Sequence, residues 1–495
     1  MAMSAREAFE KGTQTFSAHN IEGFAEVLAD DVTTPSSPAS GDRRAVVIGA
    51  SIAGLLAARV LSDRYDEVVL LERDPLSENA AARKGTPHAI HPHGLLARGN
   101  AILEELFPGF TAALIGQGAL TADIGYDVAL EAQGYRFARA SVGVSGLAVS
   151  RLSIEAELRR RVRARANVRL VTGMTVLAPV HERGQVTGVR FHPAEDASAV
   201  ERIPAALVVD CTGRGSRTPT WLREWGYEPP AEEAVKIGIA YTSAYFRRHP
   251  GIDADLRVVI GTATPAQPKP FVLIAQEPDA EGQPRWVMAV GGYEGDHVAV
   301  SLDAIQRRLS DVGSPEITAI AQKGEIIGAA LGYKFPQSER RRYERLRRFP
   351  PGFLVMGDAI ASFNPVYGQG MTVAALEAIA LRDALASDPS RLGPTFFKAA
   401  AKVVDTPWQL AVGSDLSLPQ VPGPRPLSTR LINAYVARVQ KAAVDDPQVA
   451  AAFVKVMHML APPASLFAPS VVSRVLRHHV PPAALASSAA SPAPA

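Results

Sequence analysis

The 495-residue chain contains a single cysteine, Cys211, which excludes an internal disulfide and any metal site built from several cysteines. A lone cysteine also suits a reducing compartment. The chain likewise lacks an excess of charge of one sign. Its formal net charge is +2, which gives no overall electrostatic signature for nucleic acid or for an anionic membrane. We therefore expect no nucleic-acid partner and a cytoplasmic location.

Long apolar runs are also missing. The longest, residues 45–60, is interrupted by Gly49, Ser51, Gly54 and Arg59, so it predicts a buried strand and the start of a helix rather than a membrane span. The first twenty residues mix acids with bases around no apolar centre, which is not the pattern of a signal peptide. Hydrophobic residues still make up 47% and charged residues 21%, an ordinary globular composition.

The patterns that are present change along the chain. RRAVVIG, ASIAGLLAARVLSDR and DEVVLLERD predict a strand, a helix and a second strand, which together form a βαβ unit. Residues 153–165 predict a helix with a solvated basic face. Residues from about 232 to 300 alternate β-rich pieces with turns, as a mostly antiparallel sheet does. The α/β pattern resumes at residues 353–386, and the chain then reads as helical to about residue 478.

The turn of the βαβ unit has the form of a dinucleotide-binding loop. GASIAG places Gly49 at the sharp turn after the strand and Gly54 where the helix packs on the sheet, with Ser51, Ile52 and Ala53 between them. The backbone N–H groups of the helix start would face a pyrophosphate. Glu72 lies eighteen residues beyond Gly54, close to the spacing of a carboxylate that binds a ribose hydroxyl. This segment alone leaves NAD and FAD open.

A second segment, GDAIASFNPVYGQGM, lies about 300 residues later and favours FAD. The ribityl chain of a flavin has free hydroxyls that need an acceptor, and Asp358 at the end of a strand can be one. The pyrimidine edge of the flavin needs N–H donors, which Gly370 and Met371 at the start of the following helix could supply. The same helix N-terminus would stabilise negative charge on the reduced ring.

These segments resemble the single-component flavin monooxygenases related to para-hydroxybenzoate hydroxylase. GDAIASFNPVYGQGM is similar to their G-D…P-x-x-G-x-G-M segment, and LVVDCTGRGSR to their middle D-G-x-x-S-x-x-R motif. In that motif Gly213 and Ser216 match, and Thr212 stands where the family has Asp. Within the superfamily the chain most resembles the branch of the polyether epoxidases of lasalocid and monensin biosynthesis, through GASIAGLLAARVL, ERD, RKGTPHAIHPHGLLARG and the two motifs above.

The resemblance implies roles for particular residues. Glu72 and Arg73 would hold the adenosine, and Arg98 would reach the flavin phosphate or ribityl chain. Val176 would contact adenine through its backbone, and Asp358 would bind the ribityl chain or pyrophosphate. The cofactor-binding set is Gly49, Ser51, Ile52, Ala53, Gly54, Glu72, Arg73, Arg98, Val176, Thr212, Gly213, Asp358, Pro365, Gly368, Gly370 and Met371, and the candidate pocket walls are Phe363 and Tyr367.

The resemblance also implies a fold and a domain plan. We expect an α/β fold in which a Rossmann-like FAD-binding domain is interrupted by a mostly antiparallel β-sheet substrate domain and followed by C-terminal helices. The expected divisions are a helical arm and linker (1–40), the FAD-binding domain (41–120, 150–230 and 345–390), the substrate domain (121–149 and 231–344), a C-terminal helical region (391–480) and a disordered tail (481–495).

The expected activity is insertion of one oxygen atom from O2, through a flavin C4a-hydroperoxide, into an apolar natural-product intermediate. Epoxidation in polyketide or antibiotic biosynthesis is favoured, with NADPH or NADH as reductant and a carrier protein or separate flavin reductase as candidate partners. The flavin itself supplies the hard chemistry, so no catalytic residue is assigned. The alternatives are an aromatic hydroxylase of a polyketide, a flavin-dependent reductase of prenyl chains, and a flavin-binding partner protein without activity.

Two polar features receive other interpretations. His88, His91 and His93 occur in PHAIHPHG, where Pro87 and Pro92 prevent a helix that could align them on a metal, so we expect a loop beside the flavin and no metal site. Cys211 lies in an apolar strand, so we expect it to be a packed side chain rather than a nucleophile.

Overall fold

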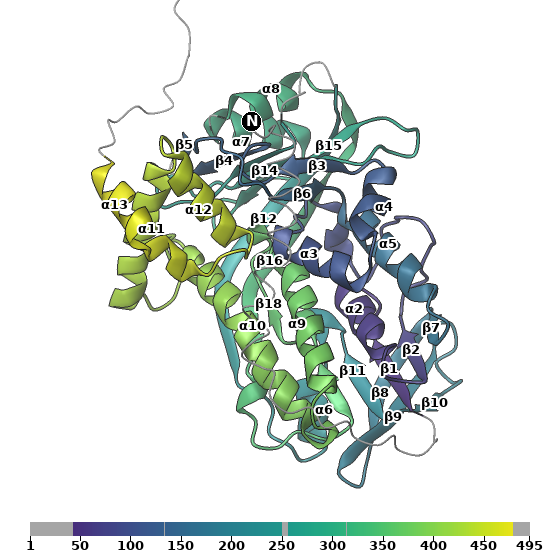
Figure 1. Ribbon diagram of the computed structural model, residues 1–495. Helices are drawn as coiled ribbons and strands as arrows, with labels where there is room; N and C mark the ends of the chain where they lie inside the picture. The colour runs from purple at the N-terminus through teal and green to yellow at the C-terminus, as the bar shows by residue number, and fades with distance from the viewer. Residues whose placement is uncertain (1–42, 133, 250–255, 313, 479–495) are drawn as a thin grey trace, which may run out of the picture. The chain divides into compact units, whose positions relative to one another are not determined.

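The computed structural model describes residues 43–132, 134–249, 256–312 and 314–478. The helical arm and linker expected at residues 1–40 and the tail expected at residues 481–495 lie outside the described residues. The described residues combine a parallel sheet with its helices, a large antiparallel sheet and a set of helices that follows them in the chain (Figure 1). This arrangement confirms the predicted α/β fold class.

A five-stranded parallel sheet forms the first layer. Its strands are short and, apart from the edge strand β7, almost entirely buried, because helices and a second sheet cover its faces. They lie in the order β17, β11, β1, β2 and β7, with bounds Phe353–Val355, Leu207–Asp210, Arg44–Ile48, Glu67–Leu71 and Val168–Val171. The carboxyl ends of β1, β11 and β17 therefore lie side by side, where a doubly wound sheet binds its ligands.

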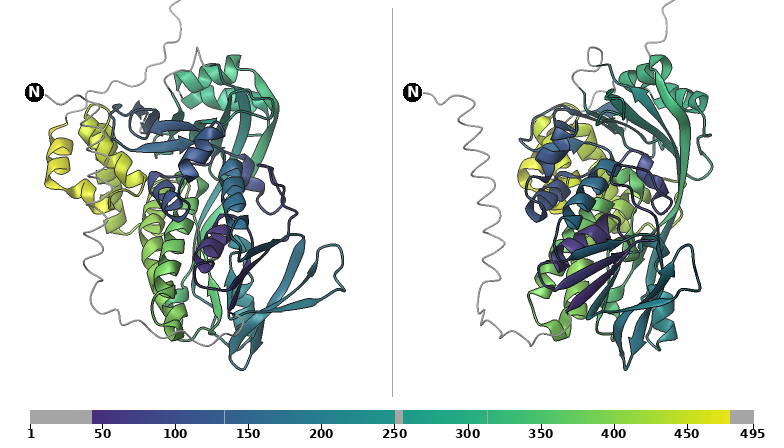
Figure 2. Two further views of the ribbon diagram at one scale, coloured as in Figure 1. Left: turned by 45° about the vertical axis from the view of Figure 1, so that its right-hand side comes forward. Right: turned by 90° about the vertical axis from the view of Figure 1, so that its right-hand side faces the viewer.

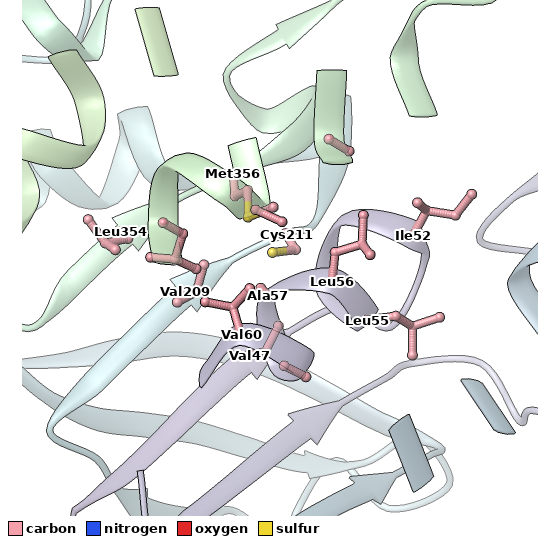
Figure 3. Close-up of a cluster of buried hydrophobic side chains, with 14 of the residues drawn as sticks. Val47, Ile52, Leu55, Leu56, Ala57, Val60, Val209, Cys211, Leu354 and Met356 are labelled. Atoms are coloured by element: carbon pink, nitrogen blue, oxygen red, sulfur yellow. The ribbon is translucent and has the colours of Figure 1, made fainter. Parts of the chain in front are cut away.

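Helices α2 (Ile52–Leu61), α5 (Arg151–Arg163) and α9 (Gly370–Leu385) pack together beside this sheet, and α3 (Ala97–Leu106) lies against α9. Figure 3 shows Val47 of β1, Val209 of β11 and Leu354 of β17 gathered with apolar side chains of α2. A three-stranded antiparallel sheet contacts the parallel sheet through β2 and β11, and its strands are β8 (Met174–Glu182), β9 (Gln185–Pro193) and β10 (Glu201–Pro204).

The second large layer is an eight-stranded sheet. All of its neighbouring strands are antiparallel except β13 and β4. In spatial order the strands are β18 (Ala361–Ser362), β16 (Ile326–Arg341), β12 (Glu232–Arg247), β15 (Arg285–Gly292), β14 (Phe271–Gln276), β13 (Val258–Gly261), β4 (Val128–Ala132) and β5 (Tyr135–Arg136). The short β18 follows directly after β17 and Asp358, so this sheet begins at the carboxyl end of the parallel sheet.

The remaining elements complete these layers. Strands β3 (Leu120–Asp123) and β6 (Ser145–Ala148) form a separate antiparallel pair, and the shorter helices are α4 (Phe110–Gly116), α6 (Thr218–Glu224), α7 (Leu302–Val312) and α8 (Pro315–Lys323). Helix α10 (Leu392–Asp415) runs alongside α9 in both views of Figure 2 and is followed by α11 (Leu427–Ala442), α12 (Pro447–Met457) and α13 (Pro469–Arg477). Within the described residues, no helix has the length and apolarity needed to cross a membrane.

Candidate functional site

The loop between β1 and α2 is shaped by its two glycines. Gly49 has φ +96°, and a Cβ there would lie 2.8 Å from the carbonyl oxygen of Cys211 on the neighbouring strand. A Cβ on Gly54 would lie 1.8 Å from the carbonyl oxygen of Gly49. Both positions therefore exclude any larger residue, which brings the start of α2 close to the strand end. Ser51 precedes α2 with φ −88°, a conformation that does not require glycine.

Glu72 lies at the end of β2 and faces this loop. Its Oε2 accepts a hydrogen bond from the backbone N–H of Ala50 (2.8 Å), and its Oε1 accepts one from the N–H of Asp74 (3.0 Å). The guanidinium of Arg83 lies 3.2 Å from Glu72, 3.2 Å from Asp74 and 2.9 Å from Glu155. The predicted ribose carboxylate is thus buried at the mouth of the predicted phosphate loop, within a cluster of charged groups.

Asp358 follows β17 and joins the distant segments of the site. The preceding residue, Gly357, has φ +72°, and a Cβ there would lie 2.6 Å from the Cβ of Ala53 in α2. A Cβ on Gly213 would lie 3.9 Å from the Cβ of Asp358, and a Cβ on Gly370 would lie 3.9 Å from its Oδ1. The three motifs quoted from the sequence therefore meet at one place, at the carboxyl ends of β1, β11 and β17.

The carboxyl of Asp358 is open to solvent but closely surrounded by protein. Burial raises its pKa, and the nearby cations Arg151 and Arg214 partly offset that rise. We call the space around the Asp358 carboxyl, on which the cations Arg151 and Arg214 act, the recess. Such a recess, lined by a hydrogen-bond acceptor and two cations, suits the polyhydroxylated and phosphorylated part of a dinucleotide.

Arg151 is a site residue that the sequence reasoning missed. It is the first residue of α5, and its Nη2 donates to Ser51 Oγ at 3.1 Å. Ser51 Oγ in turn donates to Glu155 Oε2 at 2.8 Å. Burial lowers the pKa of Arg151, and the carboxylates of Glu155 and Asp358 oppose that shift. Its Nε is buried and has no hydrogen-bond partner in the described chain, so it is a donor in need of an acceptor.

The N-terminus of α9 supplies backbone donors on the same side. Gly370 and Met371 are its first two residues, and no side chain of the described chain caps the helix. A short 3₁₀ helix, Pro365–Tyr367, is followed by Gly368, which has φ +63°. A Cβ on Gly368 would lie 3.4 Å from the carbonyl oxygen of Gly94. Uncapped N–H groups at a helix start attract an acceptor that is anionic or partly so.

The turn after β11 is organised by a carboxylate that the motif comparison did not assign. Asp210 is fully buried, and its Oδ1 accepts hydrogen bonds from the N–H and the hydroxyl of Thr212, at 2.9 and 2.6 Å. Its Oδ2 accepts from the hydroxyls of Ser216 and Thr218, each at 2.6 Å. These bonds fix the turn in which Gly213 lies close to Asp358. Thr212 therefore stabilises this turn through its N–H and its hydroxyl.

The histidine loop lies between this site and the eight-stranded sheet. His91 Nδ1 lies 2.8 Å from Ser243 Oγ, and its ring packs edge-on against Tyr241. The rings of His88 and His91 also contact Tyr333, and the hydroxyl of Tyr245 donates to the carbonyl of Ile90. In the described part of the chain, no group of three His, Cys, Asp or Glu side chains could hold a metal ion.

Burial keeps these histidines neutral. It lowers the pKa of His88 to about 2, of His91 to about 4 and of His93 to about 3, and the cation Arg151 contributes at His88 and His93. The influence of Arg151 on these rings places the loop beside the recess that contains Asp358. The wall between the recess and the sheet is therefore aromatic and uncharged at neutral pH.

Five other predicted site residues, described next, lie in different surroundings. Arg98 is exposed on the first turn of α3, where its backbone N–H donates to the carbonyl of His458. Arg73 is 67% exposed beside Asp74, and Val176 lies on β8 two residues after Met174, whose N–H donates to the carbonyl of Glu72.

Phe363 is 7% exposed and packs against Trp408 of α10. Tyr367 is partly exposed, and its hydroxyl points to Asp415.

The helix expected at residues 153–165 starts two residues earlier, and its basic side is not simply solvated. Glu155, Glu157 and Arg159 are buried, and Arg160 and Arg161 pair with Glu157. Nearer the N-terminal end of α5, the carboxylate of Glu155 accepts hydrogen bonds from Ser51 and Arg83, which belong to the site. The expectation of a solvated basic face is therefore wrong for Arg159, which is buried, and for Arg161, whose side chain is 18% exposed, whereas Arg160 and Arg163 are exposed as expected.

Comparison with known proteins agrees with this architecture. No protein-family model matches the chain. Among solved structures, the flavin-dependent brominase Bmp2 superposes with a TM-score of 0.62 at 14% identity, covering 88% of this chain and all of Bmp2 (100%). The p-nitrophenol 4-monooxygenase PnpA from Pseudomonas putida DLL-E4 superposes with a TM-score of 0.56 at 14% identity, covering 85% of this chain and 99% of PnpA. At these identities the likeness establishes the fold.

A curated sequence is much more similar. Protein Rv3254 of Mycobacterium tuberculosis (strain ATCC 25618 / H37Rv) is 35% identical over 450 residues, which is 88% of this chain and 94% of that protein. The aligned region is long enough to include the parallel sheet, the antiparallel sheet and the site between them. The chain therefore belongs to the same family as Protein Rv3254.

Proposed function

We propose that the protein binds FAD and acts as a monooxygenase, which transfers one oxygen atom of O2 to an apolar small molecule. The observation that supports this most strongly is the meeting of three glycine-rich turns with Asp358 at the carboxyl ends of β1, β11 and β17. One turn suits a pyrophosphate, and the other two with Asp358 suit a ribityl chain and a ring beyond it. The fold shared with a flavin-dependent brominase and a monooxygenase agrees with this assignment.

Each part of the cofactor has a group of this chain to hold it. Glu72 would accept hydrogen bonds from the adenosine ribose, and the start of α2 would face the pyrophosphate. Arg151 would donate its unpartnered Nε to a phosphate or ribityl oxygen, and Asp358 would accept from a ribityl hydroxyl. The uncapped N–H groups of Gly370 and Met371 would lie against the pyrimidine edge of the ring. The remaining predicted contacts, those of Arg73, Arg98 and Val176, belong to the same proposal.

When bound, FAD supplies the activation of O2 and the transfer of oxygen, with NADPH or NADH as the source of electrons, either directly or through a separate flavin reductase. The chain itself has to position an apolar substrate and exclude water from the site. The aromatic wall of His88, His91, Tyr241 and Tyr333 suits both tasks, since none of these side chains is charged at neutral pH.

The same wall favours epoxidation of a carbon–carbon double bond over hydroxylation of a phenol. Hydroxylation of a phenol is aided by a base that takes its proton, and a good base has a pKa near the working pH. The histidines of the wall have pKa values of about 2 to 4, so they would not retain a proton taken from a phenol at neutral pH. An olefin requires no such step. A polyketide-like chain with an isolated double bond is the substrate class that we propose.

Flavin binding tests the first part of this proposal. We expect the purified protein to bind about one FAD per chain, measured by its visible absorbance after gel filtration. Replacement of Asp358 by Ala should weaken FAD binding by about tenfold or more, the value of one or two buried hydrogen bonds. Glu281→Ala, at an exposed carboxylate in the turn between β14 and β15, is the control. Full FAD occupancy in Asp358→Ala at dilute FAD would contradict the assigned role of Asp358.

Isotope labelling tests the reaction. The holoenzyme, NADPH or NADH and a panel of polyene and phenolic substrates are incubated under labelled O2, and the products are analysed by mass spectrometry. An epoxide with one labelled oxygen is expected. A labelled phenol would favour the hydroxylase, a saturated product without label the prenyl-chain reductase, and a brominated product in added bromide an activity like that of Bmp2. No turnover of the bound flavin by any reductant would favour a flavin-binding protein without activity.

A further inference from the structure

The helices α11, α12 and α13, which lie side by side in Figures 1 and 2, carry an excess of positive charge. Residues 427–478 contain six lysines and arginines, two aspartates and no glutamate, a net charge of +4, whereas the whole chain has +2. The two aspartates are already engaged. Asp446 pairs with Arg474 at 2.9 Å, and Asp445 lies 3.1 Å from His478. The near-neutral charge of the whole chain therefore conceals one cationic region.

The same region exposes large apolar side chains. Of the ten that are most exposed in the described chain, six lie here, and they are Leu427, Leu431, Ile432, Leu460, Phe467 and Leu476. Single exposed apolar side chains are ordinary on a protein surface. A cluster of them, in contrast, indicates a surface that contacts another apolar body.

Several of these side chains form one continuous ridge. Leu427, Leu431 and Tyr435 are spaced four residues apart on α11, so they lie one above the other on one face of the helix. The ring of Phe467 stacks on that of Tyr435, with 4.6 Å between the ring centroids. Leu427 and Leu431 are 68% and 62% exposed, and Phe467 is 48% exposed. We call these four residues, together with Ile432 next to Leu431, the C-terminal ridge.

Unpaired cations border the ridge. Arg430 lies three residues after Leu427, and Arg438 lies three residues after Tyr435, so each is within one helical turn of a ridge residue. Lys441 follows in the last turn of the same helix, which contains no acidic residue. All three cations are exposed, and none of their side chains has an ion-pair or hydrogen-bond partner in the part of the chain that the structure describes.

We propose that the C-terminal ridge binds the surface of an anionic phospholipid membrane. The interface of a bilayer takes up exposed leucine and phenylalanine side chains, and its anionic headgroups attract lysine and arginine. A helix with leucines along one face and cations beside them presents both kinds of contact at once. This inference does not depend on the proposed function, because membrane binding requires neither flavin nor oxygen.

Two other occupants fit the ridge less well. A second copy of the chain, paired about a two-fold axis, would bring the unpaired cations of the two ridges together, and like charges repel. A protein partner would be expected to form hydrogen bonds across the contact. The hydroxyl of Tyr435, the one polar side-chain group within the ridge, already donates to the carbonyl of Leu466. A bilayer interface requires no such bond from the ridge.

Vesicle sedimentation with the full-length protein tests the contribution of charge. We expect binding to mixed vesicles of phosphatidylcholine and phosphatidylglycerol, and binding at least about tenfold weaker to phosphatidylcholine alone. Replacement of Arg430, Arg438 and Lys441 together by Gln should lower the partition coefficient on anionic vesicles on the order of 10²-fold. The matched control, which should bind like the wild type, makes the same change of charge at three exposed arginines elsewhere, Arg163, Arg223 and Arg307.

The apolar contribution is tested at the ridge itself. Leu427→Ser combined with Leu431→Ser should lower the partition coefficient on anionic vesicles by about tenfold or more. Val200→Ser combined with Val300→Ser, at exposed apolar positions outside the region, should leave it unchanged. An environment-sensitive fluorophore attached through Leu431→Cys should shift its emission to shorter wavelength when vesicles are added, and one attached through Val300→Cys should not. The native Cys211 is buried, so the label reports the introduced position.

The outcomes that would overturn the proposal are distinct. One is a wild-type protein that does not sediment with anionic vesicles, and another is equal binding by the wild type and the two ridge variants. Equal binding to neutral and anionic vesicles would also overturn it, because the cations would then have no part. Dimerisation in light scattering that Leu427→Ser with Leu431→Ser abolishes, without vesicle binding by the wild type, would assign the ridge to a second copy. Failure to find monooxygenation would count against the proposed function alone, since vesicle binding is measured without turnover.

Discussion

Gly357 and Ala53 come from segments about 300 residues apart, and a Cβ at Gly357 would lie 2.6 Å from the Cβ of Ala53. Gly357 also has φ +72°, a conformation that L side chains rarely adopt. The contact presses the turn before Asp358 against the first turn of α2. This contact fixes the separation between the Asp358 carboxylate and the predicted phosphate loop, as binding of a long dinucleotide would require.

This contact predicts a large effect of a small substitution. Gly357→Ala should destabilise the protein by about 1–3 kcal/mol through backbone strain and steric clash, and should also weaken FAD binding. Gly116→Ala at the end of α4 is the matched control, since its φ is not positive and nothing lies within 4 Å of the added Cβ. Urea unfolding and FAD titration measure the two effects. Equal stability and FAD affinity in the two variants would show that the contact is not needed.

A second prediction concerns Arg151, whose Nη2 bonds Ser51 and whose Nε lacks a partner. Arg151→Met keeps the length and apolar stem of the side chain but removes the charge, so FAD binding should weaken by about tenfold or more. Arg151→Lys should recover part of that loss, because one charged donor remains. Arg163→Met, at the exposed far end of α5, should bind FAD like the wild type. Fluorescence quenching of FAD on titration into apoprotein gives the three affinities.

Some residues of the candidate site could be predicted from the sequence, and others, such as Arg151, could not. The turn at Gly49 and Gly54 and the carboxylate of Glu72 are local features, because their spacing along one βαβ unit determines their geometry. Asp358 could be predicted because a strand end and a helix start bracket it. Arg151 could not, because it begins a helix rich in arginine that resembles a surface helix. Its role depends on where β1 and β17 end, and that is a property of the sheet order.

The same reasoning applies to the acid at the end of α10. Asp415 lies about 50 residues after Asn364, in a helix with ordinary amphipathic composition. Nothing in the neighbouring sequence distinguishes it from a solvent-exposed aspartate. Only the packing of α10 beside α9 buries it against Asn364 and Tyr367. Arg98 shows the converse. The family resemblance assigns it to the flavin, whereas its place at the exposed start of α3 does not by itself indicate a ligand, so its role stays a prediction.

Acid pH should destabilise the protein through its buried neutral histidines. His91 is 2% exposed, and burial lowers its pKa from 6.5 to about 4. Between these values the unfolded chain binds a proton that the folded chain does not, so stability falls as the pH decreases from 6.5 towards 4. His91→Gln should lose about 2 kcal/mol less than the wild type between pH 6.5 and 5, measured by urea unfolding. His249→Gln, at an exposed histidine, should keep the wild-type slope.

Glu377 should act in the opposite direction on the same stability curve. It is fully buried on α9, where its Oε2 accepts a hydrogen bond from the N–H of Gly357 at 2.6 Å and its Oε1 has no partner in the described chain. Burial raises its pKa from 4.5 to about 8, against the opposing effect of the Gly357 bond. The folded chain therefore retains a proton that the unfolded chain releases, so stability falls as the pH rises from 4.5 to 8 and levels off above that.

Glu377→Gln removes this titration and keeps an oxygen for the Gly357 N–H. Relative to the wild type, the variant should gain stability as the pH rises from 5 to 8, by up to about 4 kcal/mol, because one pKa unit corresponds to about 1.4 kcal/mol. Glu224→Gln, at an exposed glutamate at the end of α6, should show no such gain. Parallel curves for wild type and Glu377→Gln would mean that Glu377 is ionised in the folded protein. The Gly357 turn would then be held by a full charge rather than by a neutral acid.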